Sequence, residues 1–170
     1  AVGTYNVTLS VTNSGGSDIE TKTNYINVTE FVISYCSSSG NSASIEWINA
    51  VTLGSNTNNS GSNDGYGDFT SQAISVQSGQ ANSLILSPGF SGKSRREFWR
   101  VWIDYNMDGD FADAGEQVFA ADGSKSTVSG SISIPSGLTG ETRMRVSMKY
   151  NAAQTACETF SYGEVEDYTV

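Results

Sequence analysis

The chain has 170 residues, of which 37% are hydrophobic, enough for one domain with a core and for part of a second. The net charge of −9 argues against a nucleic-acid partner, whose phosphate backbone would repel the protein, and no stretch is long and apolar enough to insert into a membrane. The chain has no histidine, which removes the usual general base and the Ser-His and Cys-His nucleophilic pairs. Carboxylate-only chemistry, as in glycosidases, remains possible in principle, although we expect no catalytic residues and no enzymatic activity.

Residues 1–30 have the pattern of a β-hairpin. Apolar and polar residues alternate over residues 5–11, a turn-forming cluster follows at 13–18, and a second strand pattern covers 21–28. The stretches Gly3-Thr-Tyr5-Asn-Val7-Thr-Leu9-Ser-Val11 and Tyr25-Ile-Asn-Val28 resemble the closing half of a PKD (polycystic kidney disease) domain. We therefore expect residues 1–30 to be the C-terminal fragment of a truncated PKD-type Ig-like domain. Because an isolated hairpin is marginally stable, we expect it to pack on a neighbour, pair with another molecule or remain as a proteolytic remnant.

A short junction at residues 29–31 leads to a second unit, which we place at residues 31–170. Short strand patterns separated by turn signals run through this unit, and no helical periodicity of useful length interrupts them. The expected strands cover residues 45–53, 73–77, 83–88, 98–103, 117–120, 128–135, 143–150 and 163–170. This spacing predicts an all-β fold, an antiparallel β-sandwich of jelly-roll-like type.

The connection between the strands at 98–103 and 117–120 is dense in acidic and amide side chains. Oxygen-bearing residues occupy its first, third and fifth positions and a glycine the sixth, a pattern typical of Ca²⁺ loops. The predicted ligands are the side chains of Asp104, Asn106 and Asp108, the backbone carbonyl of Asp110, and a closing carboxylate from Asp113 or Glu116. Glu116 comes one position later than the closing glutamate of an EF-hand, and strands replace the flanking helices. The alternative is an acidic, solvated loop without a metal.

The two cysteines, Cys36 and Cys157, lie near the two ends of the second unit. Neither belongs to a Cys-x-x-Cys pair, so the sequence does not indicate a zinc site. We predict a disulfide between them, which would close a long loop and fit an oxidising compartment outside the cytoplasm. The alternative is two buried free thiols.

Residues 34–170 resemble the GEVED domain. The stretch Tyr162-Gly163-Glu164-Val165-Glu166-Asp167-Tyr168 is the signature for which that domain is named, and further matching pieces lie at residues 65–70, 101–109, 115–119 and 142–146. The resemblance implies a non-catalytic accessory module of a large bacterial protein, secreted or at the cell surface, with other domains of the parent protein as partners. Such parent proteins include peptidases, polysaccharide-degrading enzymes and adhesins, so the resemblance leaves the ligand open.

Strand alternation suggests a candidate ligand face. It places Arg100 beside Trp102 on one strand and Arg143 beside Arg145 on another, and we expect Glu164 and Glu166 to face outward with them. Such an Arg–Glu ladder can stabilise a sheet without any ligand. The same residues also suit a sugar, whose apolar faces stack on aromatic rings and whose hydroxyls bind charged groups. The predicted ligand-binding residues are Arg100, Trp102, Arg143 and Arg145, with Tyr66 and Phe69 from a polar loop.

The predicted partner is a polysaccharide, with calcium in a structural role. A basic cluster, Lys93, Arg95 and Arg96, makes a sulfated or acidic algal glycan a candidate, although a solvated turn explains it equally well. Two alternatives stay open: a calcium-stiffened spacer or adhesion module, and a module that binds the protein substrate of a secreted peptidase. Glu164 and Glu166 lie on one strand and do not flank a cleft, so we do not read them as a catalytic pair.

Overall fold

The computed structural model describes residues 1–30 and 33–170. The chain divides into two compact units, Ala1–Ile33 and Ser34–Val170. The junction predicted at residues 29–31 lies partly outside the described residues. No helix long and apolar enough to cross a membrane occurs in the part of the chain that the structure describes.

The first unit is the predicted β-hairpin. Strands β1 (Gly3–Asn13) and β2 (Gly16–Val28) pair antiparallel, and the Asn13 side chain accepts a hydrogen bond from the Gly15 N–H (2.7 Å) to stabilise the turn. The register shifts between Tyr5 and Val7, where the Asn6 side chain accepts a hydrogen bond from the Asn24 N–H (2.7 Å). Its apolar side chains are largely exposed, because two strands alone have no second layer to cover them.

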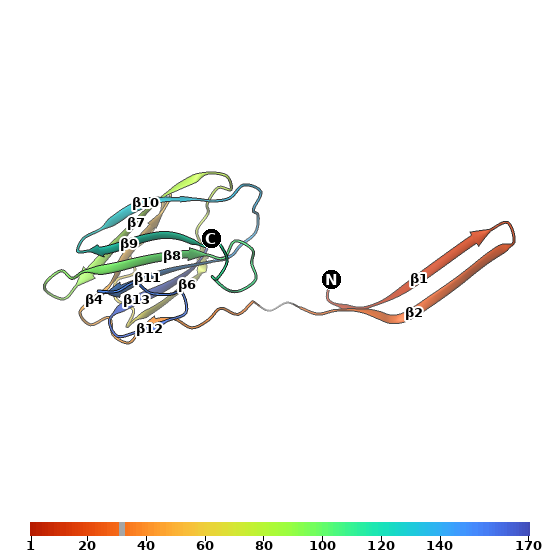
Figure 1. The fold of residues 1–170 in the computed structure, drawn as a ribbon, viewed down its shortest axis with the longest axis horizontal. Helices are drawn as coiled ribbons and strands as arrows, with labels where there is room; N and C mark the ends of the chain where they lie inside the picture. The colour runs from red at the N-terminus through yellow and green to blue at the C-terminus, as the bar shows by residue number, and fades with distance from the viewer. Residues whose placement is uncertain (31–32) are drawn as a thin grey trace. The chain divides into compact units, whose positions relative to one another are not determined.

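The second unit is a β-sandwich, which confirms the predicted fold class (Figure 1). One sheet has the strand order β10-β7-β4-β5 and the other the order β6-β13-β11-β8-β9, while β12 and β3 form a short parallel pair. The strands are β3 (Ser39–Gly40), β4 (Glu46–Leu53), β5 (Asn56–Asn58), β6 (Tyr66–Ala73), β7 (Ala81–Phe90), β8 (Glu97–Ile103), β9 (Gln117–Ser124), β10 (Val128–Ser133), β11 (Arg143–Tyr150), β12 (Thr159–Phe160) and β13 (Gly163–Thr169).

The prediction of a strand at residues 73–77 is wrong. Strand β6 covers Tyr66–Ala73 instead, where the sequence pattern indicated a polar loop up to residue 67. It pairs in parallel with β13 along the edge of the five-stranded sheet, and this pairing continues as far as the Ile74 N–H, which donates to the Thr169 carbonyl (2.8 Å). The position of this strand therefore depends on its pairing with β13, a long-range contact that the local alternation of apolar and polar residues cannot predict.

The core lies between the two sheets and matches the predicted alternation. Trp99, Val101 and Ile103 of β8 are buried together with Met144, Val146 and Met148 of β11, and they meet apolar side chains of β4 and β7 from the opposite sheet. Each fully buried aliphatic side chain contributes roughly 1.5–3 kcal/mol. Because β8 and β11 are neighbours in the centre of the sheet, the connection that follows β8 starts from a rigid position.

Candidate metal centre

The connection between β8 and β9 spans residues 104–116, and Asp104 determines its shape. Asp104 is buried, and its carboxylate accepts hydrogen bonds from the Met107 N–H (2.7 Å), the Gly109 N–H (3.1 Å) and the Tyr35 hydroxyl (2.7 Å). Met107 and Gly109 both have positive φ angles, 60° and 97°, so the loop turns tightly around this carboxylate. Asp104 thus acts as an internal brace of the loop.

Glu116 braces the same loop from its other end. Its buried carboxylate accepts hydrogen bonds from the Tyr105 N–H (3.1 Å) and the Asp113 N–H (3.2 Å). Burial raises the pKa of Glu116, and the two N–H donors oppose that rise. The carboxylate therefore ties the start of the loop to its end.

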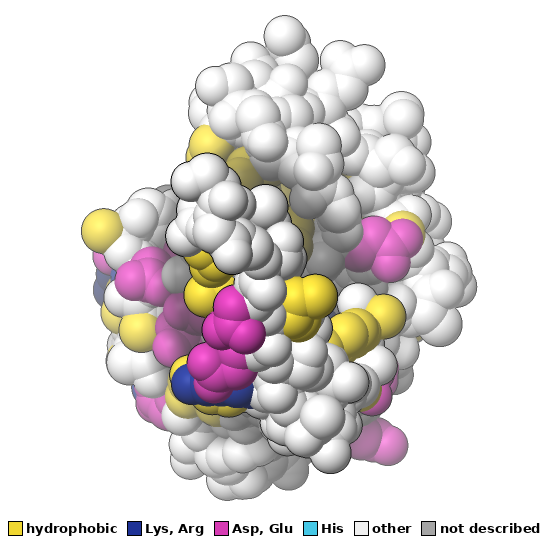
Figure 2. Space-filling view, turned by 90° about the vertical axis from the view of Figure 1, so that its right-hand side faces the viewer, with side chains coloured by type: hydrophobic (Ala, Val, Ile, Leu, Met, Phe, Trp, Pro, Cys, Tyr) yellow, Lys and Arg dark blue, Asp and Glu magenta, His cyan; other side chains and the backbone are white. Residues whose placement is uncertain are grey.

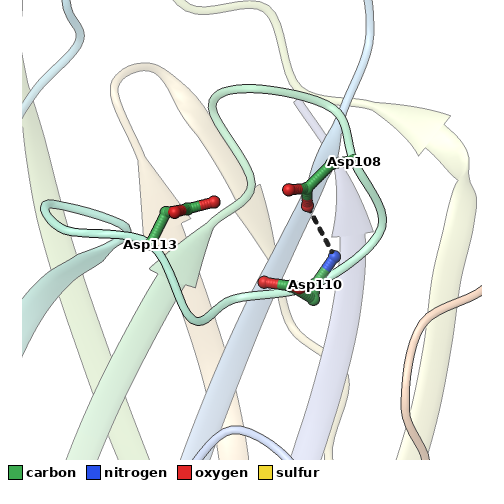
Figure 3. A group of neighbouring side chains, drawn as sticks. All are labelled: Asp108, Asp110 and Asp113. Carbon is green, nitrogen blue, oxygen red and sulfur yellow. Dashed lines mark hydrogen bonds between the residues drawn. The ribbon is translucent and has the colours of Figure 1, made fainter.

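Three exposed carboxylates converge between these braces. Asp108, Asp110 and Asp113 each offer an oxygen, and these oxygens all lie within 4.8 Å of one another. Figure 3 shows the three side chains on one loop, with the Asp110 N–H donating to Asp108 (3.1 Å). Asn106 joins the group, because its amide donates to Asp108 (2.9 Å) and to Asp113 (2.7 Å). These four residues form what we term the acidic loop cluster.

The acidic loop cluster offers the oxygen ligands that a hard cation such as Ca²⁺ prefers. All of its side chains offer oxygen, three of them carry negative charge, and the site is open to water that can complete a coordination sphere of six to eight oxygens. Three carboxylates this close repel one another unless a cation offsets their charge. Acidic side chains (magenta) also appear at several places on the face of the molecule in Figure 2.

The structure thus divides the six predicted ligands into two groups. Asn106, Asp108, Asp110 and Asp113 lie together, with Asp110 contributing its side chain and not only its backbone carbonyl. The carboxylates of Asp104 and Glu116 do not belong to this group and accept hydrogen bonds from backbone N–H groups of the loop. The sequence spacing could not make this distinction, because it shows oxygen-bearing residues without showing which donors they meet.

An aromatic layer lies behind the loop. Tyr35 stacks on Phe111 of the loop, with ring centroids 5.3 Å apart. The Arg143 guanidinium lies 4.7 Å from the Tyr35 ring centroid, and the Arg145 guanidinium lies 5.1 Å from that of Phe111. Burial, together with the hydrogen bond to Asp104, raises the pKa of Tyr35 to about 12, so Tyr35 remains a neutral donor. Neither Tyr35 nor Phe111 was among the predicted site residues, although an apolar residue inside an acidic loop is a usable signal.

Asp167 of the Gly-Glu-Val-Glu-Asp motif connects this layer to the sheet. Its carboxylate accepts two hydrogen bonds from Arg145, from Nε (2.7 Å) and Nη2 (2.8 Å). It also accepts one from Arg143 Nη1 (3.1 Å) and one from the Tyr66 hydroxyl (3.0 Å). Burial and the Asp167 charge raise the pKa of Tyr66 to about 12. Asp167 is thus a buried carboxylate with a full set of donors.

The predicted disulfide between Cys36 and Cys157 is confirmed. It joins segments that lie over the outer face of β8 and β11, since Arg145 Nη1 donates to the Ala156 carbonyl (2.8 Å) and lies 3.5 Å from Cys36 Sγ. Tyr35 precedes Cys36 in the chain and contacts Asp104 through its hydroxyl. The disulfide therefore fixes the position of Tyr35, whose hydroxyl in turn contacts Asp104 of the 104–116 loop.

The outer face of β8 and β11 is not the open ligand face that we predicted. Trp102 is 4% exposed and packs with Phe111, Ala156 and Tyr35, and Arg145 is 2% exposed. Arg100 is also buried and donates to Asp122 and to the Trp99 carbonyl. Segments from three distant parts of the chain cover this face, which strand alternation alone does not reveal.

Of the other predicted ligand residues, Phe69 is half-buried and stacks on Tyr168 at 5.4 Å between ring centroids. Tyr66 remains 39% exposed, and the Arg143 side chain 26%. These two therefore remain accessible among the six predicted ligand residues.

The predicted outward ladder of Glu164 and Glu166 is also wrong. The register places Glu164 opposite Met148 and Glu166 opposite Val146, on the core face of the sheet, whereas Asp167 lies opposite Arg145 on the outer face. Glu164 accepts hydrogen bonds from the backbone of Ile48 and Asn63, and Glu166 accepts one from the Tyr168 hydroxyl (2.6 Å). Burial raises the pKa of Glu166 to about 7.

Comparison with known proteins bears on this unit. Residues 98–170 match the family model of the GEVED domain, a stretch that runs from β8 to the end of the chain and includes the 104–116 loop and the Gly-Glu-Val-Glu-Asp motif at β13. Residues 34–97, which we had assigned to the same domain, and the hairpin that resembles a PKD domain lie outside the matched stretch. No curated protein is similar enough to count as a match. The chain thus carries a GEVED domain match on the half of its sandwich that holds the candidate metal centre.

Proposed function

We infer that this chain is a non-catalytic, calcium-stabilised accessory module of a secreted bacterial multidomain protein, and that it binds polysaccharide. The convergence of Asp108, Asp110 and Asp113 is the observation that carries the calcium part of the proposal. The disulfide and the GEVED match support an extracellular setting. Extracellular calcium modules bind the ion with dissociation constants of roughly 10⁻⁴–10⁻³ M, and an exposed site of this kind suits that range.

In this proposal the acidic loop cluster holds the ion, and Asp104 and Glu116 keep the loop in the shape that brings the carboxylates together. A bound Ca²⁺ supplies positive charge that offsets the repulsion among the three aspartates. An ion bound at Asp110 would also restrict the position of the adjacent Phe111, which stacks on Tyr35 in the aromatic layer. Calcium would therefore be structural, and the chain would lose stability without it.

Thermal unfolding in chelator and in millimolar calcium tests the metal. Saturation at 100 times the dissociation constant adds about 2.7 kcal/mol to the free energy of unfolding, which raises Tm. The double variant Asp108→Asn with Asp113→Asn should lose this rise, whereas Asp64→Asn, which neutralises an exposed aspartate in another loop, should keep it. A Tm for the unaltered chain that is the same in chelator and calcium refutes the calcium proposal.

Tyr66 and Arg143 support the polysaccharide part of the proposal. Both are partly exposed, and both bind the same oxygen, Oδ2 of Asp167, so an aromatic ring and a guanidinium are held near each other. Such a pair can stack on the apolar face of a sugar and bind its hydroxyl, carboxylate or sulfate groups. In this proposal the buried Arg145 holds the same Asp167 carboxylate in place, and the buried Arg100, Trp102 and Arg145 make no contact with the sugar.

A pull-down on insoluble polysaccharides, together with a glycan array, tests this part in calcium and in chelator. Tyr66→Ala should reduce retention at least tenfold, while Tyr162→Ala, which removes another exposed tyrosine, should leave it unchanged. If the folded, calcium-loaded chain binds no glycan, a spacer or adhesion role becomes the better explanation. Selective binding to a protein fibre would instead favour a module that presents substrate to a peptidase.

A further inference from the structure

Two glutamates begin facing strands in opposite sheets of the sandwich. Glu46 is the first residue of β4 and Glu97 the first residue of β8, and both are fully buried. Alternation along each strand puts Glu46 on the same face as the core residue Ile48, and Glu97 on the same face as Trp99. Phe90, which pairs with Glu46, is joined to Glu97 by the short connection of residues 91–96, so the two glutamates lie at the same end of the core, where each raises the cost of ionising the other.

These carboxyl groups lack the partners that buried acids normally have. None of their four oxygens accepts a hydrogen bond from any residue within 1–30 or 33–170. Arg95 Nε lies 3.6 Å from an oxygen of Glu46 and has no hydrogen-bond partner among those residues either. Other buried acids of this chain, such as Asp104 and Asp167, accept several hydrogen bonds each. The Glu46–Glu97 pair is therefore a buried group that the proposed metal and ligand sites do not use.

The surroundings of the pair limit its charge. Within residues 1–30 and 33–170, the contact between Arg95 and Glu46 is the one ion pair that either glutamate makes. On the neighbouring strands of each sheet, the register partner of Glu46 is Phe90, and those of Glu97 are Ser124 and Tyr150. With both glutamates ionised, two buried negative charges would face one arginine, which is costly in a dry site. A single proton on the pair makes the group of three neutral.

A proton also resolves the missing hydrogen bonds. A protonated carboxyl group gains an O–H donor, which a neighbouring carboxylate can accept. Arg95 lies against Glu46, so Glu46 is the better-stabilised anion and Glu97 the better proton carrier. A divalent cation suits the site less well, because Ca²⁺ takes six to eight oxygens and the arginine would repel it. The proton satisfies both the charge and the hydrogen bonding.

We propose that Glu46 and Glu97 share one buried proton, which Glu97 donates to a Glu46 carboxylate held by Arg95, and that this proton links the stability of the sandwich to pH. The site is distinct from the acidic loop cluster and does not depend on calcium. It joins the first residues of two strands in opposite sheets, so loss of the proton places a repulsive pair between the sheets.

Burial, followed by the negative charge of Glu46, raises the pKa of Glu97 from 4.5 to about 8. The unfolded chain therefore releases this proton at a lower pH than the folded chain does. The stabilisation is complete below about pH 4.5 and is lost progressively as pH rises to about 8. In that range the equilibrium constant for unfolding should rise by up to tenfold per pH unit on account of this pair.

Urea unfolding between about pH 5 and 9 tests the proposal in three variants at saturating calcium. Glu97→Gln keeps an N–H donor toward Glu46 that does not ionise, so its unfolding constant should lack the rise with pH that this pair causes in the unaltered chain. The ratio of the variant's unfolding constant to that of the unaltered chain should therefore fall up to tenfold per pH unit across this range. Glu46→Gln removes the anion and leaves Arg95 unpaired, so it should destabilise the chain at low pH. The exposed control Glu141→Gln should leave the pH dependence unchanged. Equal pH dependence in Glu97→Gln and the unaltered chain overturns the proposal.

A second measurement does not require Glu97→Gln to fold. The measurement uses the Glu166→Gln variant, because Glu166 also has a pKa raised to about 7 and would contribute its own signal. Infrared spectroscopy of this variant should show a protonated carboxylic acid at about pH 6 that is absent by about pH 10. Absence of that band at about pH 6 means that both glutamates are ionised and refutes the shared proton.

Discussion

Replacing Asp167 by Asn should destabilise this chain far more than a surface substitution of the same type. The change keeps the shape of the side chain but removes the negative charge that faces Arg145, whose side chain is 2% exposed. Asp167 also accepts hydrogen bonds from Arg143 and from Tyr66, so one substitution weakens four contacts. Leaving a buried charge without its partner costs about 3–5 kcal/mol, and we expect a loss in that range.

Asp122→Asn is the matched control. Asp122 also pairs with an arginine, Arg100, at 2.7 Å, but the Asp122 side chain is 61% exposed, so water screens this pair more than the Asp167–Arg145 pair and we expect a smaller loss. Urea unfolding of both variants at about pH 7, in saturating calcium, gives the two losses directly. If Asp167→Asn lowers the free energy of unfolding no more than Asp122→Asn does, the buried network around Asp167 does not stabilise the fold more than a surface pair.

Three further predictions concern other parts of the sandwich. Replacing both cysteines by Ser should lower the free energy of unfolding by about 5 kcal/mol, because the disulfide closes a loop with a sequence separation of 121, and a loss below about 1 kcal/mol in urea unfolding would contradict this. Gly163→Ala should cost at least about 3 kcal/mol, because its φ is +118° and the added Cβ would lie 2.0 Å from the Met148 carbonyl oxygen, whereas Gly137→Ala, at an open position, should cost about 1 kcal/mol. Equal unfolding midpoints for the two glycine variants would refute the steric argument. The unaltered chain should lose stability between about pH 5 and 7 in part through Glu166, whose pKa burial raises from 4.5 to about 7, so Glu166→Gln should reduce that loss in pH-dependent thermal unfolding.

The core and the hairpin could be predicted because they follow from local alternation. Apolar residues at every second position must share one face of a strand, and burial of that face is the main favourable term in folding. The core faces of β8 and β11 were correct for this reason, as was the hairpin at residues 1–30. The acidic loop could be found for a similar reason, since a tight turn between two strands brings its own side chains close together.

The covered outer face could not be predicted, because it depends on contacts between distant segments. Trp102 and Arg145 read as outward from their strands, and they do lie on the outer face, but Phe111, Tyr35 and the disulfide-linked segments bury them. Alternation assigns a face to a residue without showing whether another part of the chain lies on that face. The same limit explains why most residues of the predicted sugar-binding face are inaccessible to a ligand.

Apart from β6, whose position depends on its pairing with β13, the sequence by itself determined the main strand pattern, the acidic loop and the two cysteines that pair, because each of these depends on neighbouring residues or on residue type. Tertiary structure alone decided the register of β13 against β11, and with it the roles of its acids. A shift of one residue reverses every side chain of a strand, so the register that puts Asp167 beside Arg145 also puts Glu164 and Glu166 on the core face. The meeting of Glu46 with Glu97 likewise depends on how two sheets pack, which no local pattern in either strand specifies.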